Sequence, residues 1–425
     1  MKSKNLFSVT FATVMCSALL IAIIFMGNKI SNEKSKLPIQ QDINAGNSGE
    51  LPENNGGTNE DYIVNPQKPP EPVIKNVSFI AAGDNIVHQS VIDDAKKLGE
   101  AGGKAYDFTP MYENIKGMIS EADIAFINQE GPIAGKSLNG YTGYPVFNAP
   151  DEVGHALVDT GFDIINIANN HLLDRGAKGY ENSINFWNSQ PVFLVGGYKS
   201  EEDFNTIRYY EYNDLTIAFL SYTYGTNGIY LPADSTLWAP YYDRETVDKH
   251  SKEARENADI VIASMHWGDE NSFFPNNIQK EYCNILVNNN VDVIIGTHPH
   301  VLQPIEWQTR PDGKQTLVAY SIGNLLSTML YSKYMVGGLL TFDISYTEPE
   351  NAEIVNPKLI PTFCYYSKSR DALKVHKLSD ITEEKYQSHG CTLNENVSYE
   401  SVLRYVTNTI DSDFLSDDFL SFMNK

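Results

Sequence analysis

The sequence predicts an α/β fold in which two β-sheets pack together with helices on the outside. Short β-branched runs alternate with helical stretches from residue 77 to about residue 300, which is typical of parallel strands joined by helices. Residues 207–224 instead have the pattern of a hairpin that turns at Asn213 and Asp214, so antiparallel strands join the fold. Residues 316–321 and 337–345 are further apolar runs, which we expect to be strands of a second sheet.

The individual elements follow from the same patterns. Strands are expected at 77–82, 124–127, 163–168, 192–195, 260–265 and 291–295. Helices are expected at 106–121, 151–160, 179–189, 243–257 and 277–289. Beyond residue 345 the patterns weaken, although 355–366 is compatible with further strands and 399–410 with a terminal helix.

The composition excludes some classes of partner. The 425 residues carry a formal net charge of −22, from 54 acidic and 32 basic side chains. This charge argues against nucleic acid, and against an anionic lipid surface, as the main partner. Cys16 lies in an apolar N-terminal run, and the other three cysteines are too scattered for a disulfide framework or a CxxC metal motif. A single Cys364–Cys391 pair stays open.

The N-terminus has the pattern of a membrane anchor. Lys2 and Lys4 precede an apolar run from residue 6 to residue 26, and Lys29 follows it. About 20 apolar residues suffice to cross a bilayer. We therefore expect residues 1–5 in the cytoplasm and residues 6–28 as an uncleaved, single-pass signal anchor in the cell membrane. The rest of the chain is then extracytoplasmic, and secretion after cleavage of a signal peptide is the alternative.

The remaining chain divides by composition. Residues 29–75 are rich in Asn, Gly, Pro and Glu and have few large apolar side chains, so they cannot bury a core. We expect a disordered linker there, followed by a folded domain at 76–345. Residues 346–425 are expected to form an extension that packs on this domain.

The strand predicted at 291–295 ends in two histidines one residue apart. Gly296 permits a tight turn, and His298 and His300 follow on either side of Pro299. Open α/β sheets place their sites at the carboxyl ends of strands, and imidazole is the commonest protein metal ligand. By itself, however, this pattern is as compatible with a polar loop as with half of a metal site.

Four other predicted strands also end in groups that bind metals. They are Asp84, Glu130 with Asn128, Asn170 with His171, and His266. Each has a structural alternative, since Asp84 follows a glycine as turn residues often do, and His266 is compatible with a satisfied core histidine. Because such groups recur at strand after strand, they predict a site for one or two divalent transition-metal ions. A carboxylate that bridges two metals is used in phosphoryl and related hydrolyses.

Six motifs occur in order along the chain at these positions. They are Gly83-Asp84, Asn128-x-Glu130-Gly-Pro132, Ala168-Asn-Asn-His171-x-x-Asp174-x-Gly176, His266-Trp-Gly268, Gly296-x-His-Pro-His300-x-x-Gln303-Pro304 and Tyr320-Ser-x-Gly-Asn324. Over residues 77–343 the chain thereby resembles the CapA-type family of poly-gamma-glutamate capsule synthesis proteins, a branch of the calcineurin-like metallophosphoesterase superfamily. The resemblance implies a four-layer αββα sandwich of two mixed sheets with a dinuclear metal cleft.

The resemblance also implies roles for individual residues. Glu130 stands where the superfamily usually has an aspartate that bridges both metals, and His171 stands beside the bond to be cleaved. Asp174 is a second catalytic candidate, which would orient His171 unless it is the N-cap of the next helix. The implied metal ligands are Asp84, Glu130, Asn170, His266, His298 and His300.

Other positions are candidates for contact with the substrate. Asn128 and Asn324 would help to form the cleft, and Arg175 would grip an anion near the catalytic histidine or lie on the surface. The aromatic side chains of residues 224–243, Tyr224 among them, would form either a wall that contacts the substrate or a packed lid without specificity.

The first strand departs from the superfamily pattern. Asp84 is followed by Asn85 and Ile86, where Asp-x-His is usual. His88 would either replace the missing histidine or face solvent.

Two functions follow as hypotheses. The first is a membrane-anchored, metal-dependent hydrolase or transferase in capsule or envelope polymer biosynthesis, with zinc, manganese or iron as the metal. Its substrate would be a phosphoester or an amide of an anionic, poly-gamma-glutamate-like polymer. The second is a non-catalytic subunit that binds the polymer and associates with membrane-bound capsule synthetase subunits.

Overall fold

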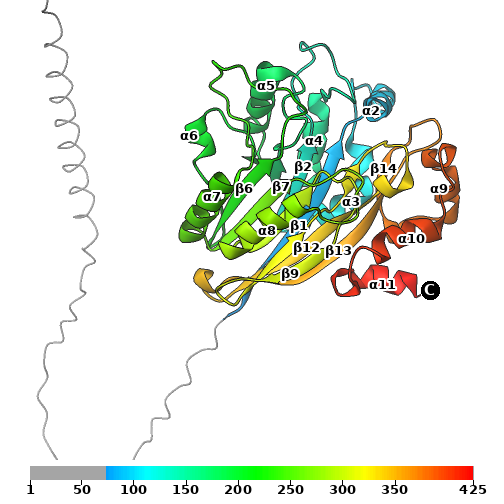
Figure 1. Cartoon of the computed structure of the whole chain (residues 1–425). Helices are drawn as coiled ribbons and strands as arrows, with labels where there is room; N and C mark the ends of the chain where they lie inside the picture. The colour runs from blue at the N-terminus through cyan, green and yellow to red at the C-terminus, as the bar shows by residue number, and fades with distance from the viewer. Residues whose placement is uncertain (1–72, 425) are drawn as a thin grey trace, which may run out of the picture. The chain divides into compact units, whose positions relative to one another are not determined.

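The computed structural model describes residues 73–424, which form two mixed β-sheets with helices packed against them (Figure 1). The first sheet has the strand order β14-β13-β12-β1-β2-β3-β4, with β11 also paired to β1. Its strands are β1 Lys75–Ile86, β2 Ile124–Glu130, β3 Ile164–Asn166, β4 Phe193–Val195, β11 Asn324–Leu326, β12 Val336–Tyr346, β13 Glu353–Tyr365 and β14 Lys374–Lys377.

The second sheet has the strand order β5-β6-β7-β8-β10-β9. Its strands are β5 Arg208–Tyr212, β6 Leu215–Thr223, β7 Ile260–His266, β8 Val293–Thr297, β9 Ile305–Thr309 and β10 Gln315–Ala319. The helices are α2 Gln89–Ala101, α3 Thr109–Ser120, α4 Asp151–Thr160, α5 Gly176–Asn188, α6 Glu201–Phe204, α7 Arg244–Asn257, α8 Asn277–Asn288, α9 Glu383–Ser388, α10 Tyr399–Thr407 and α11 Asp417–Met423.

Alternate residues of the strands pack on opposite faces of the second sheet. Along β6, Ile217 and Phe219 belong to the core shared with the first sheet, and the Phe219 ring lies 6.5 Å from that of Phe79 in β1. Ala218 and Leu220 belong instead to a separate core that includes apolar residues of α7 and α8. All residues of β2 and β7 are buried, as expected of strands covered on both faces. These contacts confirm the four-layer αββα arrangement.

Several predictions of individual helices and strands are confirmed. The helix at α4 has the predicted bounds, and α7 begins after Asp243, whose side chain accepts the Thr246 N–H as an N-cap. The hairpin β5–β6 turns where expected, and Asn213 adopts the left-handed φ of 51° that such a turn requires. The stretch at 355–366 overlaps most of β13, and the stretch at 399–410 contains α10.

The assignment of strands to sheets was partly wrong. Residues 316–321 and 337–345 were expected in one sheet, but they lie in different sheets. β10 pairs in parallel with β8, whereas β12 pairs antiparallel with β1, with Val77 opposite Ile344. Periodicity identifies a strand but not its partner, because the partner is chosen by packing between distant segments. Helices α2, α6, α9 and α11 and strands β9, β11 and β14 were not predicted.

The predicted boundary at residue 345 falls within the last residues of β12, which pairs with β13. β13 pairs with β12 along nearly its whole length, so residues after 345 complete the first sheet as well as packing on it. The described cysteines Cys283, Cys364 and Cys391 are buried and free, so the open Cys364–Cys391 pair is not formed.

The predicted cytoplasmic residues 1–5, the anchor at 6–28 and nearly all of the linker lie outside the described residues. Within residues 73–424, no helix combines the length and apolarity needed to span a membrane.

Candidate metal centre

The candidate site lies where strands of both sheets end. β1 and β2 run in parallel with Asp84 opposite Asn128, so their carboxyl ends lie at one edge of the first sheet. In the second sheet, β7 and β8 run in parallel with His266 opposite Thr297, immediately before His298. The polar residues at these ends are buried, which is unusual for charged groups without partners.

The two edges meet in direct contact. The backbone N–H of His298 donates to Asp84 Oδ2 at 3.1 Å, and His300 Nδ1 lies 3.3 Å from the same oxygen. His300 Nε2 lies 3.9 Å from Glu130 Oε1. His298 and His300 have φ values of 96° and 60°, a left-handed backbone that costs non-glycine residues about 1–3 kcal/mol each. The fold therefore holds these two imidazoles in place at the expense of local strain.

Six side chains form two groups with the composition of metal sites. Within each group, one ligand atom per residue lies within 4.8 Å of the others. The groups are Asp84, Glu130 and His266, and Glu270, His298 and His300.

Two buried atoms of these groups lack hydrogen-bond partners among the described residues. They are Glu130 Oε2 and His298 Nδ1. A buried polar atom without a partner costs about 1–3 kcal/mol, and a bound cation would satisfy both. Carboxylate and imidazole ligands also suit divalent transition ions, so the residues fit a divalent metal.

The pKa values of the titratable side chains in the centre are shifted in different directions. Burial raises the pKa of Glu130 to about 7. Burial lowers the pKa of His300, but the charge of Glu130 and the contact with Asp84 outweigh it and raise that pKa to about 9. Burial, and then the neighbouring histidines, hold the pKa values of His266 and His298 well below the usual range. Those two imidazoles are therefore neutral near pH 7, which is the form that binds metals.

Amide side chains contact two of the candidate ligands. Asn128 Nδ2 donates to Asp84 Oδ1 at 2.7 Å, and Asn324 Oδ1 lies 3.1 Å from His300 Nδ1. Both amides are almost fully buried, and the remaining hydrogen bonds found for them are also to protein groups. All of these contacts are with candidate ligands or other protein groups, and the expected role of the two amides in binding substrate stays a prediction.

Asn170 contacts His266, which ends strand β7 of the second sheet. Its Oδ1 lies 3.0 Å from His266 Nε2, while His266 Nδ1 lies 2.9 Å from Thr297 Oγ1. The Tyr224 ring lies 4.6 Å from that of His298, which brings the start of the predicted aromatic wall to the centre.

His171 and Asp174 form a buried pair next to Glu130. His171 Nδ1 lies 2.8 Å from Asp174 Oδ2, and His171 Nε2 lies 3.9 Å from Glu130 Oε1. Burial lowers the pKa of His171, but the hydrogen bond to Asp174 and the charge of Glu130 raise it above its ordinary value. Asp174 is not the N-cap of α5, because the N-cap is Arg175. The orienting interaction expected of Asp174 is therefore present.

Arg175 makes its contacts with a surface loop. Its Nη2 donates to Thr142 Oγ1 and, at 3.1 Å, to the Val146 carbonyl oxygen. The guanidinium thus ties residues 142–146 to the start of α5, and its predicted grip on an anion near His171 is not among these contacts.

Comparison with known proteins identifies the family. The family model described as bacterial capsule synthesis protein PGA_cap matches residues 78–329, which is more than half of the chain. The chain belongs to the PGA_cap family. The CapA-type resemblance is thereby confirmed. The PGA biosynthesis protein CapA of Bacillus subtilis is 33% identical over 181 residues, 40% of this chain and 44% of the relative.

Other relatives and solved structures are also similar. The capsule biosynthesis protein CapA of Bacillus anthracis is 30% identical over 183 residues, 42% of this chain and 43% of the relative. The chain thus matches less than half the length of either curated relative. The 5′-nucleotidase precursor of Thermus thermophilus has a TM-score of 0.39 and 11% identity, covering 68% of this chain and 54% of its own. The NAD nucleotidase of Haemophilus influenzae has a TM-score of 0.39 and 10% identity, covering 83% and 59%.

The PGA_cap centre contains one candidate ligand that the sequence analysis missed. Glu270 is exposed and follows His266 by four residues, in the loop after β7. A carboxylate so soon after a histidine at a strand end was the available clue, but exposed acidic residues are common in this chain.

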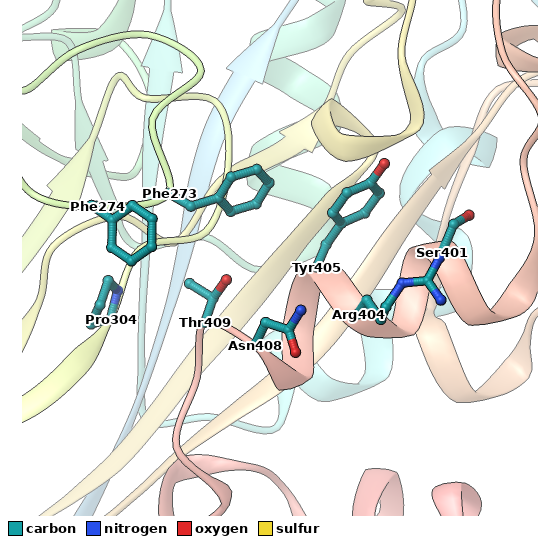
Figure 2. A pocket seen from close by; sticks show the side chains of 8 residues that line it. All are labelled: Phe273, Phe274, Pro304, Ser401, Arg404, Tyr405, Asn408 and Thr409. Carbon is teal, nitrogen blue, oxygen red and sulfur yellow. The ribbon is translucent and has the colours of Figure 1, made fainter.

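The loop that carries Glu270 is packed against the C-terminal part of the PGA_cap chain. The rings of Phe273 and Tyr405, the latter in α10, stack 5.7 Å apart at 13°. Figure 2 shows this pair at a cavity of about 350 Å³ between the loop and α10.

His88 joins neither ligand group, and its side chain is partly exposed. Its ring contacts Phe147 edge-on at 5.6 Å, and Phe147 contacts His171 at 4.6 Å. Burial lowers the pKa of His88 to about 3. His88 therefore does not replace the histidine expected after Asp84 in either ligand group of residues 73–424.

Proposed function

We propose that this PGA_cap protein is a metal-dependent hydrolase or transferase that acts on an anionic capsule or envelope polymer. The observation that carries the proposal is the convergence of two buried ligand groups beside the His171–Asp174 pair. The names of the two Bacillus relatives, which refer to PGA and capsule biosynthesis, support a polymer of the poly-gamma-glutamate type.

The metal would be held by the two ligand groups. Asp84, Glu130 and His266 would hold one divalent ion, and Glu270, His298 and His300 would hold a second. When bound, such ions polarise the group under attack and make water a stronger nucleophile near neutral pH. Mixed carboxylate and imidazole ligands favour zinc, manganese or iron.

The protein's own groups supply the acid. Asp174 holds Nδ1 of His171, which leaves Nε2 to carry a proton toward the departing oxygen or nitrogen. Because Asp174 and Glu130 favour the charged imidazole, His171 retains that proton until the bond breaks. Burial of the pair keeps water from competing for it.

We also propose that residues 6–28 anchor the chain and place the folded part outside the cytoplasm. The support is the apolar run flanked by Lys2, Lys4 and Lys29. Protease added to intact spheroplasts should degrade the folded part. A chain that is cut only after the membrane is permeabilised would contradict this placement.

Metal content, measured by elemental analysis of the full-length chain, tests the enzymatic proposal. We expect about two equivalents in the wild type, in keeping with two ligand groups, and a reduced content in His298→Ala. His155→Ala removes an exposed histidine of α4 and should leave the content unchanged. A folded chain that binds no metal would refute the proposal. Bound metal without cleavage of γ-glutamyl amides or phosphoesters would favour the polymer-binding alternative.

A further inference from the structure

A second cavity adjoins the candidate metal centre. Its volume is about 540 Å³, and it is lined by residues of five separated segments, including Gln89, Glu270, Tyr331 and Arg370. Glu270 also belongs to the ligand group with His298 and His300. A ligand in this cavity would therefore extend directly from the metal centre.

Arg370 is the cation of this cavity. Within residues 73–424 its guanidinium has no ion pair and no hydrogen bond, although the chain as a whole is strongly acidic. The adjacent Asp371 is engaged elsewhere, with Lys97 Nζ at 3.1 Å. A tight turn presents Arg370: its N–H donates to Ser367 O at 2.8 Å, and its φ is 59°. The turn thus exposes a guanidinium that none of the described side chains neutralises.

The start of α2 adds a second feature that favours an anion. Gln89 and Ser90 are the first residues of this 13-residue helix, both line the cavity, and no side chain caps the helix. The N-terminal N–H groups of a helix carry partial positive charge. Leu330 and Tyr331, both partly exposed, add apolar surface to the lining of the cavity.

We propose that this cavity binds a carboxylate of the polymer chain through Arg370, one or more units away from the bond at the metal centre. The inference rests on the proposed function, because it takes the metal centre as the place of reaction. A guanidinium fork matches a planar carboxylate with two parallel hydrogen bonds. The aliphatic stem of a glutamyl unit would lie against Leu330 and Tyr331. Arg370 is thus a specificity-determining residue for a substrate with repeated carboxylates.

Calorimetric titration of the metal-loaded, full-length chain tests the assignment. The probes are a γ-linked tetraglutamate, the same peptide with its α-carboxylates converted to carboxamides, and inorganic phosphate. We expect Arg370→Gln to weaken tetraglutamate binding by about tenfold or more, and Arg370→Lys to recover part of the loss. Lys368→Gln removes an exposed cation of the same turn that does not line the cavity, and should change the Kd less than about twofold.

Several results would overturn the inference. They are equal losses in Arg370→Gln and Lys368→Gln, wild-type binding of the carboxamide peptide as tight as that of tetraglutamate, and a loss confined to phosphate. The proposed function fails separately. Binding that depends on Arg370 without any metal-dependent cleavage would refute the enzymatic proposal and leave the carboxylate site intact. Metal-dependent cleavage whose KM is unchanged in Arg370→Gln would refute the carboxylate site and leave the enzymatic proposal intact.

Discussion

The backbone N–H of His298 donates a 3.1 Å hydrogen bond to Asp84 Oδ2, although 214 positions separate the two residues. Asp84 lies in the first sheet and His298 follows the central strand β8 of the second. A metal held by Asp84 and by His266, which ends β7 of the second sheet, would likewise tie the two sheets together at this edge. Binding that requires the folded arrangement adds to the stability of the fold.

Metal should stabilise the wild type but not Glu130→Gln. At a free metal concentration of 100 times Kd, a site that exists only in the folded state adds about 2.7 kcal/mol to the free energy of unfolding. Removal of the metal by a chelator should abolish this gain. In Glu130→Gln, the metal-dependent shift in the urea midpoint should be small or absent. Glu256→Gln, an exposed residue of α7, should retain the full shift. A full shift in Glu130→Gln would show that this carboxylate is not a ligand.

The acid pair should control the pH dependence of activity. His171→Ala should lower kcat by about 10²- to 10⁴-fold on a substrate with a poor leaving group, with metal content unchanged. Asp174→Asn removes an interaction that raises the pKa of His171. Since an acid is lost as pH rises through its pKa, the alkaline limb of the kcat profile should move to lower pH in Asp174→Asn. An unmoved limb would contradict the assignment of His171 as the acid.

Glu270 should matter for metal binding and little for folding. Because it is exposed, Glu270→Gln should change the free energy of unfolding by no more than about 0.5 kcal/mol. Its metal content should nevertheless fall. Asp269→Asn neutralises the adjacent exposed acid, which belongs to neither ligand group, and should bind metal like the wild type. Equal metal loss in both variants would point to general charge rather than to a ligand.

The stack of Phe273 on Tyr405 should position the loop that carries Glu270 (Figure 2). Tyr405→Ala should destabilise the fold by about 0.5–1.5 kcal/mol beyond the apolar area it exposes, weaken metal binding and hasten proteolysis of the loop. Tyr405→Phe keeps the ring and should behave like the wild type in all three respects. Unaltered metal affinity in Tyr405→Ala would show that α10 does not position the loop that carries Glu270.

Asp292 should be important for stability alone. It is buried beside β8, where it accepts from Arg255 at 2.8 Å and from Arg310 at 2.5 Å. Breaking a buried pair costs about 3–5 kcal/mol, so Asp292→Asn should lower the urea midpoint strongly without changing metal content per folded chain. Asp312→Asn removes the more exposed partner of Arg310 and should cost less than about 1 kcal/mol. Similar midpoints for both variants would contradict this difference.

The sequence predicted elements whose causes are local. The N-cap at Asp243 and the left-handed turn at Asn213 depend on neighbouring residues, so the predictions for α7 and for the β5–β6 hairpin are confirmed. The histidines and carboxylates at strand ends were also visible, because parallel strands bring their carboxyl ends to one edge whatever their order. Family membership followed from the same motifs.

Only the tertiary structure decided which segments meet. It paired β12 with β1 rather than with β10, and it brought Glu270 to His298 and Arg370 to the cavity beside them. The position of Glu270 four residues after His266 was a weak local clue, and nothing in the local sequence separates Arg370 from other exposed charges. The reason is physical: periodicity and capping act over a few residues, whereas a binding site is assembled by packing between segments hundreds of residues apart.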